Sequence, residues 1–279
     1  MSASPIVDCR GLVHIYKADE LEVVALQGLD LAVAAGEVVA IVGASGSGKT
    51  TLMNVLAAVD RPSAGYASVG GWDLAALGEG QRDRYRREVV GYVWQDSVLN
   101  LMLQVTVEQN LQLPMMAAGV RWAERRARAQ ELLRGFGIWD RRRHLPGQLP
   151  GGEQQRLALG IAMANRPQVL LADEPTAQLD RASASQVLAD LHDLRDRDGT
   201  TVIMVTHDHE VERYADRVLR IRDGRTSTES RAASGELVIL DRAGRLQLPK
   251  SVIAETGLRE RVRVRVEDGR VVLEPGDDA

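Results

Sequence analysis

The chain has 279 residues and a formal net charge of −4, which allows one large α/β domain plus a small one and gives no overall positive field for nucleic acid. Its single cysteine, Cys9, excludes an internal disulfide and fits a reducing compartment. We expect no signal peptide at residues 1–5, and apolar runs such as residues 169–172 are too short to span a bilayer. Any membrane-spanning helices are therefore expected on another chain.

The first predicted elements are two strands, at residues 6–16 and 25–33, on either side of a polar turn. The second alternates apolar residues with polar or small ones, as a half-buried strand does. Tyr16 closes the first strand. Its ring either packs at the edge of a sheet or stacks on a nucleobase, and these residues leave both interpretations open.

The next stretch predicts a nucleoside triphosphate site. The pattern G-x-x-x-x-G-K-T lies between an apolar strand, residues 37–42, and a helical pattern from Thr51 onward. In this order the N–H groups of the loop and the positive end of the helix point at phosphate oxygens. Lys49 can reach the β- and γ-phosphates, and the Thr50 hydroxyl can ligate Mg²⁺. The spacing disfavours the alternative of a flexible Gly/Ser turn. The predicted phosphate-binding residues are Gly43, Ala44, Ser45, Gly46, Ser47, Gly48, Lys49, Thr50 and Thr51.

Beyond the phosphate helix we expect a turn at residues 60–65, a short hairpin arm at 66–72 and a charged helix at 77–87. A strand at residues 89–94 then ends at Gln95. A glutamine in this place is usually a polar cap. Beside a triphosphate it can also hold the Mg²⁺ shell and a water.

Helical periodicity follows over residues 106–136, with an arginine-rich part that we interpret as a solvated helix face rather than a nucleic-acid patch. The segment 149–156 opens a further helix, predicted at residues 154–165. Gly151 and Gly152 offer bare N–H groups to an anion at the start of that helix. Taken alone, this signal is weak.

Two buried strands carry candidate catalytic residues. The apolar run 169–172 ends in Asp173 and Glu174, and ligands bind at that end of parallel strands. Asp173 suits the Mg²⁺-bound water shell, and Glu174 suits a general base; the alternative is a solvated strand end. A strand near residues 199–206 brings His207 to the same edge, within reach of a γ-phosphate oxygen or the attacking water, although a lone histidine is more often structural.

Six motifs in this order resemble the ATP-binding subunit of ABC transporters over residues 5–228. They are Tyr16, the loop 43–50, Gln95, the signature 149–156, Asp173 and Glu174 with Asp180, and His207. The conjunction is far more specific than any one motif. The stretches 52–54 and 60–65 are similar to the lipoprotein-release, macrolide-efflux and cell-division branch.

The resemblance implies an α/β nucleotide-binding domain with an antiparallel β subdomain and a helical signature subdomain at about residues 96–165. Two subunits would face head-to-tail, so that each ATP lies between the phosphate loop of one and the signature of the other. The implied nucleotide contacts are adenine stacking by Tyr16 and closure of Pro150, Gly151 and Gly152 on the partner's ATP, with Asp180 lining the dimer seam. The implied metal ligands are Thr50, Gln95 and Asp173.

The resemblance also implies an ATP hydrolase that drives a separate membrane permease. Glu174 would be the base, His207 the γ-phosphate sensor, and Gln95 the link between Mg²⁺ and the permease contact. The permease would have a large external loop and hold the chain at the inner face of the cell membrane, for export or extracytoplasmic mechanical work. A soluble ABC protein of translation or DNA repair usually has two nucleotide domains or a long coiled-coil insertion, and the sequence shows neither.

One position departs from the family pattern. The signature usually has Ser where this chain has Pro150. Proline suits the first turn of a helix but removes a hydroxyl and an N–H at the γ-phosphate. We expect slower turnover rather than lost nucleotide binding.

A hairpin at residues 217–225, turned by Asp-Gly, and a polar linker at 229–235 are expected to end the ATPase domain. Residues 236–276 then resemble the swapped-hairpin β-barrel of transition-state regulators and antitoxins. Its predicted elements are strands at 237–240, 246–248, 262–266 and 270–274, and a short helix that ends at Gly257.

About 40 residues cannot form a stable core alone, which fits the intertwined dimer of that family. Eight Lys and Arg against nine Asp and Glu over residues 236–279 give a net charge of −1, poor for a phosphate backbone. A dimerisation module that raises the effective concentration of two ATPase halves is therefore favoured. The alternative is a DNA-binding or regulatory protein with an ATPase switch.

Overall fold

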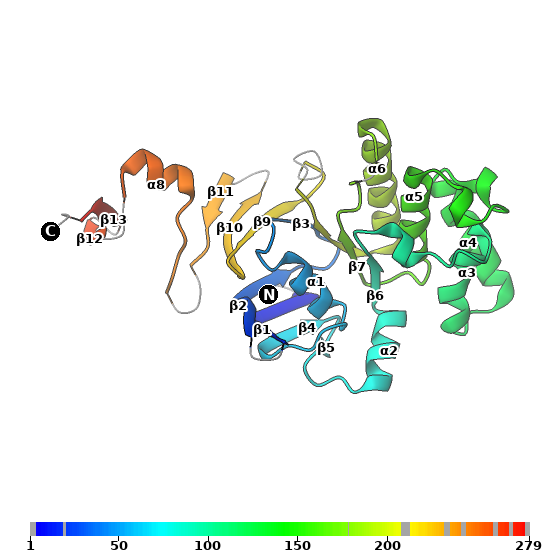
Figure 1. Cartoon of the computed structure of the whole chain (residues 1–279), viewed down its shortest axis with the longest axis horizontal. Helices are drawn as coiled ribbons and strands as arrows, with labels where there is room; N and C mark the ends of the chain where they lie inside the picture. Colours follow the sequence, from blue (N-terminus) through cyan, green and yellow to red (C-terminus); the bar gives the residue numbers. More distant parts are fainter. Residues whose placement is uncertain are drawn as a thin grey trace.

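The computed structural model describes residues 4–18, 21–177, 179–207, 213–231, 235–240, 244–258, 262–267 and 270–276. Within these ranges the strands form sheets of seven, four and two strands. Figure 1 shows the two larger sheets at the centre, a helical part in green at one end and the C-terminal elements in orange and red at the other. The predicted α/β fold, with an antiparallel β part and a helical part, is confirmed.

The seven-stranded sheet positions the phosphate loop and the predicted catalytic residues. Its strands follow the order β11 (Gly235–Val238), β10 (Arg225–Arg231), β9 (Arg217–Arg222), β3 (Val38–Val42), β8 (Thr201–Val205), β7 (Val169–Asp173) and β6 (Val90–Val93). The strands from β9 to β6 are parallel to their neighbours, whereas β10 and β11 are antiparallel. Strands β3, β7 and β8 are buried along their whole length, which explains their uninterrupted apolar sequences.

The antiparallel sheet consists of β2 (Leu21–Val33), β1 (Val7–Ala18), β4 (Ala64–Val69) and β5 (Trp72–Asp73). The phosphate helix α1 (Lys49–Leu56) packs where this sheet meets the larger one. Leu29 of β2, Ile41 of β3 and Leu52 of α1 belong to one buried cluster. The two sheets therefore share a core, and the strand that ends near Tyr16 is fixed relative to the phosphate loop.

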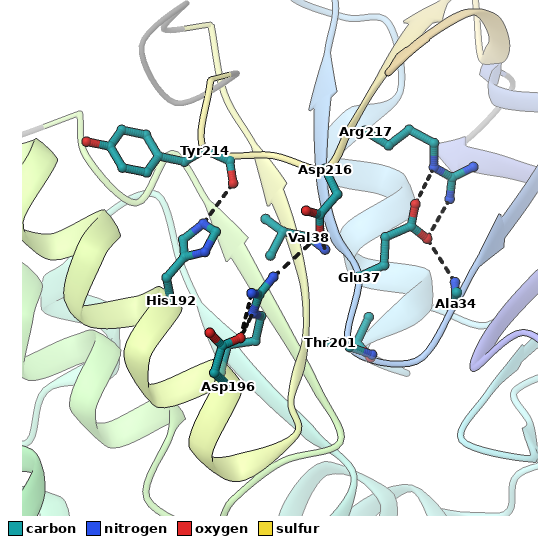
Figure 2. A network of polar contacts seen from close by, with 11 residues as sticks. Ala34, Glu37, Val38, His192, Asp196, Thr201, Tyr214, Asp216 and Arg217 are labelled. Atoms are coloured by element: carbon teal, nitrogen blue, oxygen red, sulfur yellow. Dashed lines mark hydrogen bonds and ion pairs between the residues drawn. The ribbon is translucent and has the colours of Figure 1, made fainter. Parts of the chain in front are cut away.

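A polar network fixes the amino end of β3 (Figure 2). The Arg217 guanidinium lies 2.7 Å from the Glu37 carboxylate, which also accepts a 2.9 Å hydrogen bond from the Ala34 N–H. The Val38 N–H donates to Asp216 over 2.8 Å, so the entry to β3 is tied to the segment before β9. Because β3 leads directly into the phosphate loop, this network fixes the strand from which the loop projects.

The helical part lies between β5 and β8 in the sequence. Its elements are α2 (Glu79–Glu88), the 3₁₀ turn η1 (Ser97–Asn100), α3 (Val107–Ala117), α4 (Trp122–Gly135), the 3₁₀ turns η2 (Trp139–Arg141) and η3 (Pro146–Gln148), α5 (Gly151–Ala162) and α6 (Arg181–Asp198). Thr106 and Gln109 form reciprocal capping hydrogen bonds at the start of α3. Helix α5 begins at Gly151, three residues before the predicted start, so the signature glycines are inside its first turn.

The prediction that the arginine-rich segment is a solvated face is wrong for Arg128. Its side chain is 3% exposed and donates to Asp198 at the end of α6, to Glu131 over 2.9 Å and to the Met163 carbonyl over 2.9 Å. Arg126 is exposed, as predicted. Spacing on a helix does not reveal that the end of α6 covers one side of α4.

The C-terminal prediction needs two corrections. Residues 229–231 of the predicted linker continue β10, and Gly235 begins β11, which pairs with β10 in the large sheet. Residues 246–248 are not a strand. The short helix α8 (Lys250–Thr256), ended by Gly257, and the hairpin of β12 (Val262–Glu267) with β13 (Arg270–Pro275) agree with the prediction. The barrel itself would need a second copy, because the described hairpin is a separate two-stranded sheet.

Candidate functional site

The phosphate loop connects β3 to α1 and is held against the turn between β9 and β10. The Gly224 N–H donates to the Ser47 carbonyl over 3.1 Å. A Cβ at Gly43 would lie 2.3 Å from the Ile221 carbonyl oxygen, and a Cβ at Gly48 would lie 2.5 Å from the Ala25 carbonyl oxygen. Gly48 also has φ of 99°, which disfavours other residues. Close backbone packing therefore requires glycine at both positions, and the positive φ is a second reason at Gly48.

Lys49 is folded over the loop at the start of α1. Its Nζ donates to the carbonyls of Gly43 and Ala44, each over 2.8 Å. The cationic group thus lies beside the loop N–H groups and the positive end of α1, where negative charge is favoured. This arrangement suits a polyphosphate.

Thr50 and Asp173 bring two oxygen ligands together from different elements. The Thr50 hydroxyl donates to Asp173 Oδ2 over 3.3 Å. Burial is the largest influence on Asp173 and raises the pKa of its carboxyl, although the hydrogen bond from Thr50 opposes the shift. A hydroxyl and a carboxylate next to a phosphate site fit Mg²⁺, which binds through one or two carboxylates plus substrate phosphates and water.

Glu174 and His207 form a direct pair at the ends of β7 and β8. Glu174 Oε1 lies 2.7 Å from His207 Nδ1. The glutamate has φ of 51°, a conformation uncommon for a residue with a side chain, and its N–H donates to the Val205 carbonyl over 2.9 Å. The backbone is thus turned so that the carboxylate faces the histidine, in the arrangement of a general base with an orienting partner.

A cavity of about 620 Å³ gathers most of the predicted site residues. Its lining includes Tyr16, Gly43, Ser45, Gly46, Gly48, Lys49, Thr50, Thr51, Gln95, Asp173, Glu174 and His207. The cavity therefore brings together the residue predicted to stack on the nucleobase, the phosphate loop, the predicted metal ligands and the predicted catalytic pair.

Two residues of this cavity were not predicted: Val23 and Val24 line it beside Tyr16 and are exposed. The adjacent valines interrupt the alternation of β2, and that interruption is the signal that could have identified them. They add apolar wall near the aromatic ring, as a nucleobase requires.

The signature residues do not line this cavity. Pro150 is the N-cap of α5, and Gly151 and Gly152 start the helix. Asp180 caps α6 by accepting a 3.0 Å hydrogen bond from the Ser183 N–H; hydrogen bonds from Ser183 hold the pKa of Asp180 below its usual value. Within one chain the phosphate loop and the signature are therefore separate surfaces.

A family model described as "ABC transporter" matches residues 26–177. The chain is similar to the macrolide export ATP-binding/permease protein MacB of Escherichia coli (strain K12) and of Shigella flexneri, with 46% identity over 221 residues in each case. These residues make up 79% of this chain and 34% of each relative, so the chain spans about a third of the length of the curated relatives it matches.

Among solved structures, the chain is similar to a dimeric post-hydrolysis state of the ATP-binding cassette MJ0796 bound to ADP and Pi. The TM-score is 0.75 at 34% identity, covering 81% of this chain and 98% of that one. It is also similar to CbiO1 from Clostridium perfringens, part of the ABC transporter complex cbiONQ. That TM-score is 0.74 at 27% identity, covering 82% of this chain and 89% of that one.

Proposed function

This chain belongs to the ABC transporter family of ATP-binding cassettes, and from that membership we propose that it hydrolyses ATP in a head-to-tail dimer to drive a permease on a separate chain. The observation that carries the proposal is the cavity in which Lys49, Asp173 and the Glu174–His207 pair face one space. Two similarities support this proposal. One is to MJ0796, which is dimeric and bound to ADP and Pi, and the other is to the macrolide export protein MacB.

In the proposed mechanism the loop N–H groups and Lys49 hold the β- and γ-phosphates. Thr50, Asp173 and Gln95 would hold Mg²⁺, which would neutralise phosphate charge when bound. Glu174 accepts a proton from the attacking water, and His207 holds the carboxylate in place through the 2.7 Å contact and senses the γ-phosphate. Tyr16 stacks on the adenine.

A second copy would complete each site. The exposed start of α5 presents Gly151 N–H to an anion, but it lies outside the cavity of its own chain. In a head-to-tail pair the signature of one chain covers the phosphates held by the other. ATP then closes the dimer and hydrolysis opens it, and the permease converts this movement into export or extracytoplasmic mechanical work.

The proposed permease contact is an exposed apolar patch directly after Gln95. It consists of Val98, Leu99, Met102 and Leu103, and Leu99 is 69% exposed. Clustered apolar side chains on a surface are typical of a protein interface. In the described residues no helix is long and apolar enough to cross a membrane. The patch would hold this chain at the inner membrane face, against a permease with a large external loop.

The C-terminal hairpin supports dimerisation rather than DNA binding. Cross-strand pairs Val264–Leu273 and Val266–Val271 lie on one face, and Val264, Val266 and Val271 are each exposed. A lone two-stranded sheet is marginal in water, so a second copy that covers this face would stabilise it. On the other face, Arg265 lies 3.6 Å from Glu274, which reduces the positive charge available to a phosphate backbone.

The ATPase activity is tested with Glu174→Gln. Loss of a general base should lower the turnover rate about 100-fold or more, with ATP binding within about threefold. Glu79→Gln, an exposed carboxylate on α2, is the matched control and should keep the wild-type rate. A Glu174→Gln variant with normal turnover contradicts the assignment of the base.

The permease contact is tested separately, by co-purification with a candidate permease that has four membrane helices. Leu99→Glu should abolish capture and leave the ATPase rate of the isolated chain unchanged. Met116→Glu, an equally apolar exposed site on α3, should not affect capture. Capture that survives Leu99→Glu excludes this patch.

A further inference from the structure

The segment 60–63, which lies between α1 and β4, runs along β1 near its end and contacts four consecutive residues of that strand. The Ser63 N–H donates to the Val13 carbonyl over 2.9 Å, and the Ser63 Oγ accepts from the Ile15 N–H over 3.0 Å. His14 Nδ1 lies 3.1 Å from the Arg61 carbonyl oxygen. The last contact is the Tyr16 hydroxyl, which donates to Asp60 Oδ2 over 2.8 Å. The segment therefore holds the strand that carries the cavity's aromatic ring.

The Tyr16 ring is fixed at its hydroxyl and on one side. The His14 ring meets it in a T-shaped contact, with 4.6 Å between ring centroids. The ring is nevertheless 39% exposed and lines the cavity next to Val23 and Val24. Without the hydroxyl contact, a half-exposed side chain at a strand end would sample other rotamers.

Asp60 is itself positioned by the phosphate helix. Asn54 of α1 donates from Nδ2 to Asp60 Oδ2 over 3.3 Å, and Tyr92 of β6 donates to Asn54 Oδ1 over 3.4 Å. One carboxylate oxygen thus connects the ring to the helix that begins at the phosphate loop. The distance between a base-stacking ring and the phosphates is set through this contact.

We propose that Asp60 is a positioning residue for the nucleobase: it fixes the Tyr16 ring at the separation from the phosphate loop that a nucleoside triphosphate spans. The inference rests on the proposed binding of ATP in this cavity. It assigns a role to the segment 60–63, which the phosphate, metal and catalytic contacts leave unused. The contribution of the nucleobase to the affinity for ATP then depends on Asp60, whereas the contribution of the phosphates does not.

The test compares the binding of ATP with that of inorganic tripolyphosphate, both with Mg²⁺, to the full chain by calorimetry. Tyr16→Ala should weaken ATP about 5- to 100-fold, the range for losing a base–aromatic stack, and leave tripolyphosphate within about twofold. Asp60→Ala should weaken ATP about three- to tenfold, as expected for a partly exposed hydrogen bond, also without affecting tripolyphosphate.

Two further variants separate positioning from folding. Asp60→Asn retains an oxygen acceptor for the Tyr16 hydroxyl and should restore ATP affinity to within about twofold. In a Tyr16→Phe background, which lacks the hydroxyl, Asp60→Ala should weaken ATP by less than about twofold further.

The inference is overturned if Asp60→Ala weakens ATP and tripolyphosphate equally, because Asp60 then supports the phosphate helix alone. It is also overturned if Asp60→Asn is as weak as Asp60→Ala, or if Tyr16→Ala leaves ATP affinity unchanged. Wild-type protein that binds neither ligand would instead contradict the proposed function.

Discussion

Arg128 on α4 and Asp198 at the end of α6 form a buried ion pair, with side chains 3% and 4% exposed. Arg128 also pairs with Glu131, and two further arginines lie near these two carboxylates. Arg166 Nε lies 3.7 Å from Asp198, and Arg197 Nη1 lies 2.9 Å from Glu131. The pair connects α4 to α6, the helix that follows β7 in the sequence.

Arg128→Ala should destabilise the chain by about 3–5 kcal/mol, because it leaves the Asp198 carboxylate buried without its main partner. The double variant Arg128→Met with Asp198→Leu should cost less, since no buried charge remains. Urea unfolding measures both. Arg126→Ala, on the exposed side of α4, should change stability by less than about 0.5 kcal/mol, and a similar loss in this control would contradict a specific role for the pair.

Asp173→Asn should raise the melting temperature of the nucleotide-free chain at pH 7. Burial raises the pKa of Asp173, so the folded state binds a proton more tightly than the unfolded state, and the stabilising effect of protonation is present at low pH and lost as pH rises through the raised pKa. At pH 7 the ionised carboxylate is therefore unfavourable, and asparagine removes that charge.

The gain from Asp173→Asn should shrink below the normal aspartate pKa, where the wild-type carboxyl is protonated in both states. The same variant should lose Mg²⁺-dependent ATP hydrolysis. Thermal unfolding between pH 3 and pH 8 measures the first effect. A variant that is less stable than wild type at pH 7 would show that the carboxylate stabilises the fold.

Pro150→Ser should raise the turnover rate. Serine supplies a hydroxyl and an N–H at the start of α5. One charge-assisted hydrogen bond to the γ-phosphate contributes about 1–3 kcal/mol, or about 5- to 150-fold in rate. The affinity for ATP in the monomer should change little, because Pro150 does not line the cavity of its own chain. Steady-state ATPase assays with Pro150→Ala as the control decide the matter, and an unchanged rate refutes the idea.

Deleting residues 244–279 should reduce dimers of the nucleotide-free chain. The cut leaves β11 in place, because that strand pairs with β10 in the large sheet and its removal would expose the sheet edge. Val264→Glu in the full chain should have the same effect, since it places a charge on the apolar face of the hairpin. Arg265→Ala, on the opposite face, is the control, and light scattering gives the mass.

A mass that the deletion and Val264→Glu leave unchanged contradicts the dimerisation module. A gel shift with the full chain and duplex DNA tests the alternative. Tight, sequence-selective and salt-sensitive binding that Arg265→Ala abolishes would favour DNA recognition instead.

The parts of the site that depend on neighbouring residues could be predicted from the sequence. The phosphate loop, the carboxylates at the end of β7 and the Asp-Gly turn could be predicted, because the periodicity of strands and helices and the chemistry of turns are local properties. The hairpin of β12 and β13 could be predicted for the same reason, from strict alternation around a turn.

Which of these parts meet depends on contacts between residues far apart in the chain. Tyr16 and Asp60 are far apart in the sequence but in contact in the fold. Arg128 is buried by the end of α6, which the residues around Arg128 in the sequence cannot reveal. Strand β11 joins the large sheet rather than the hairpin. Pro150 and Gly152 are also kept out of the cavity that holds Lys49. These contacts depend on which surfaces from distant parts of the chain pack against each other and are buried from water. A local sequence pattern does not specify the packing partner.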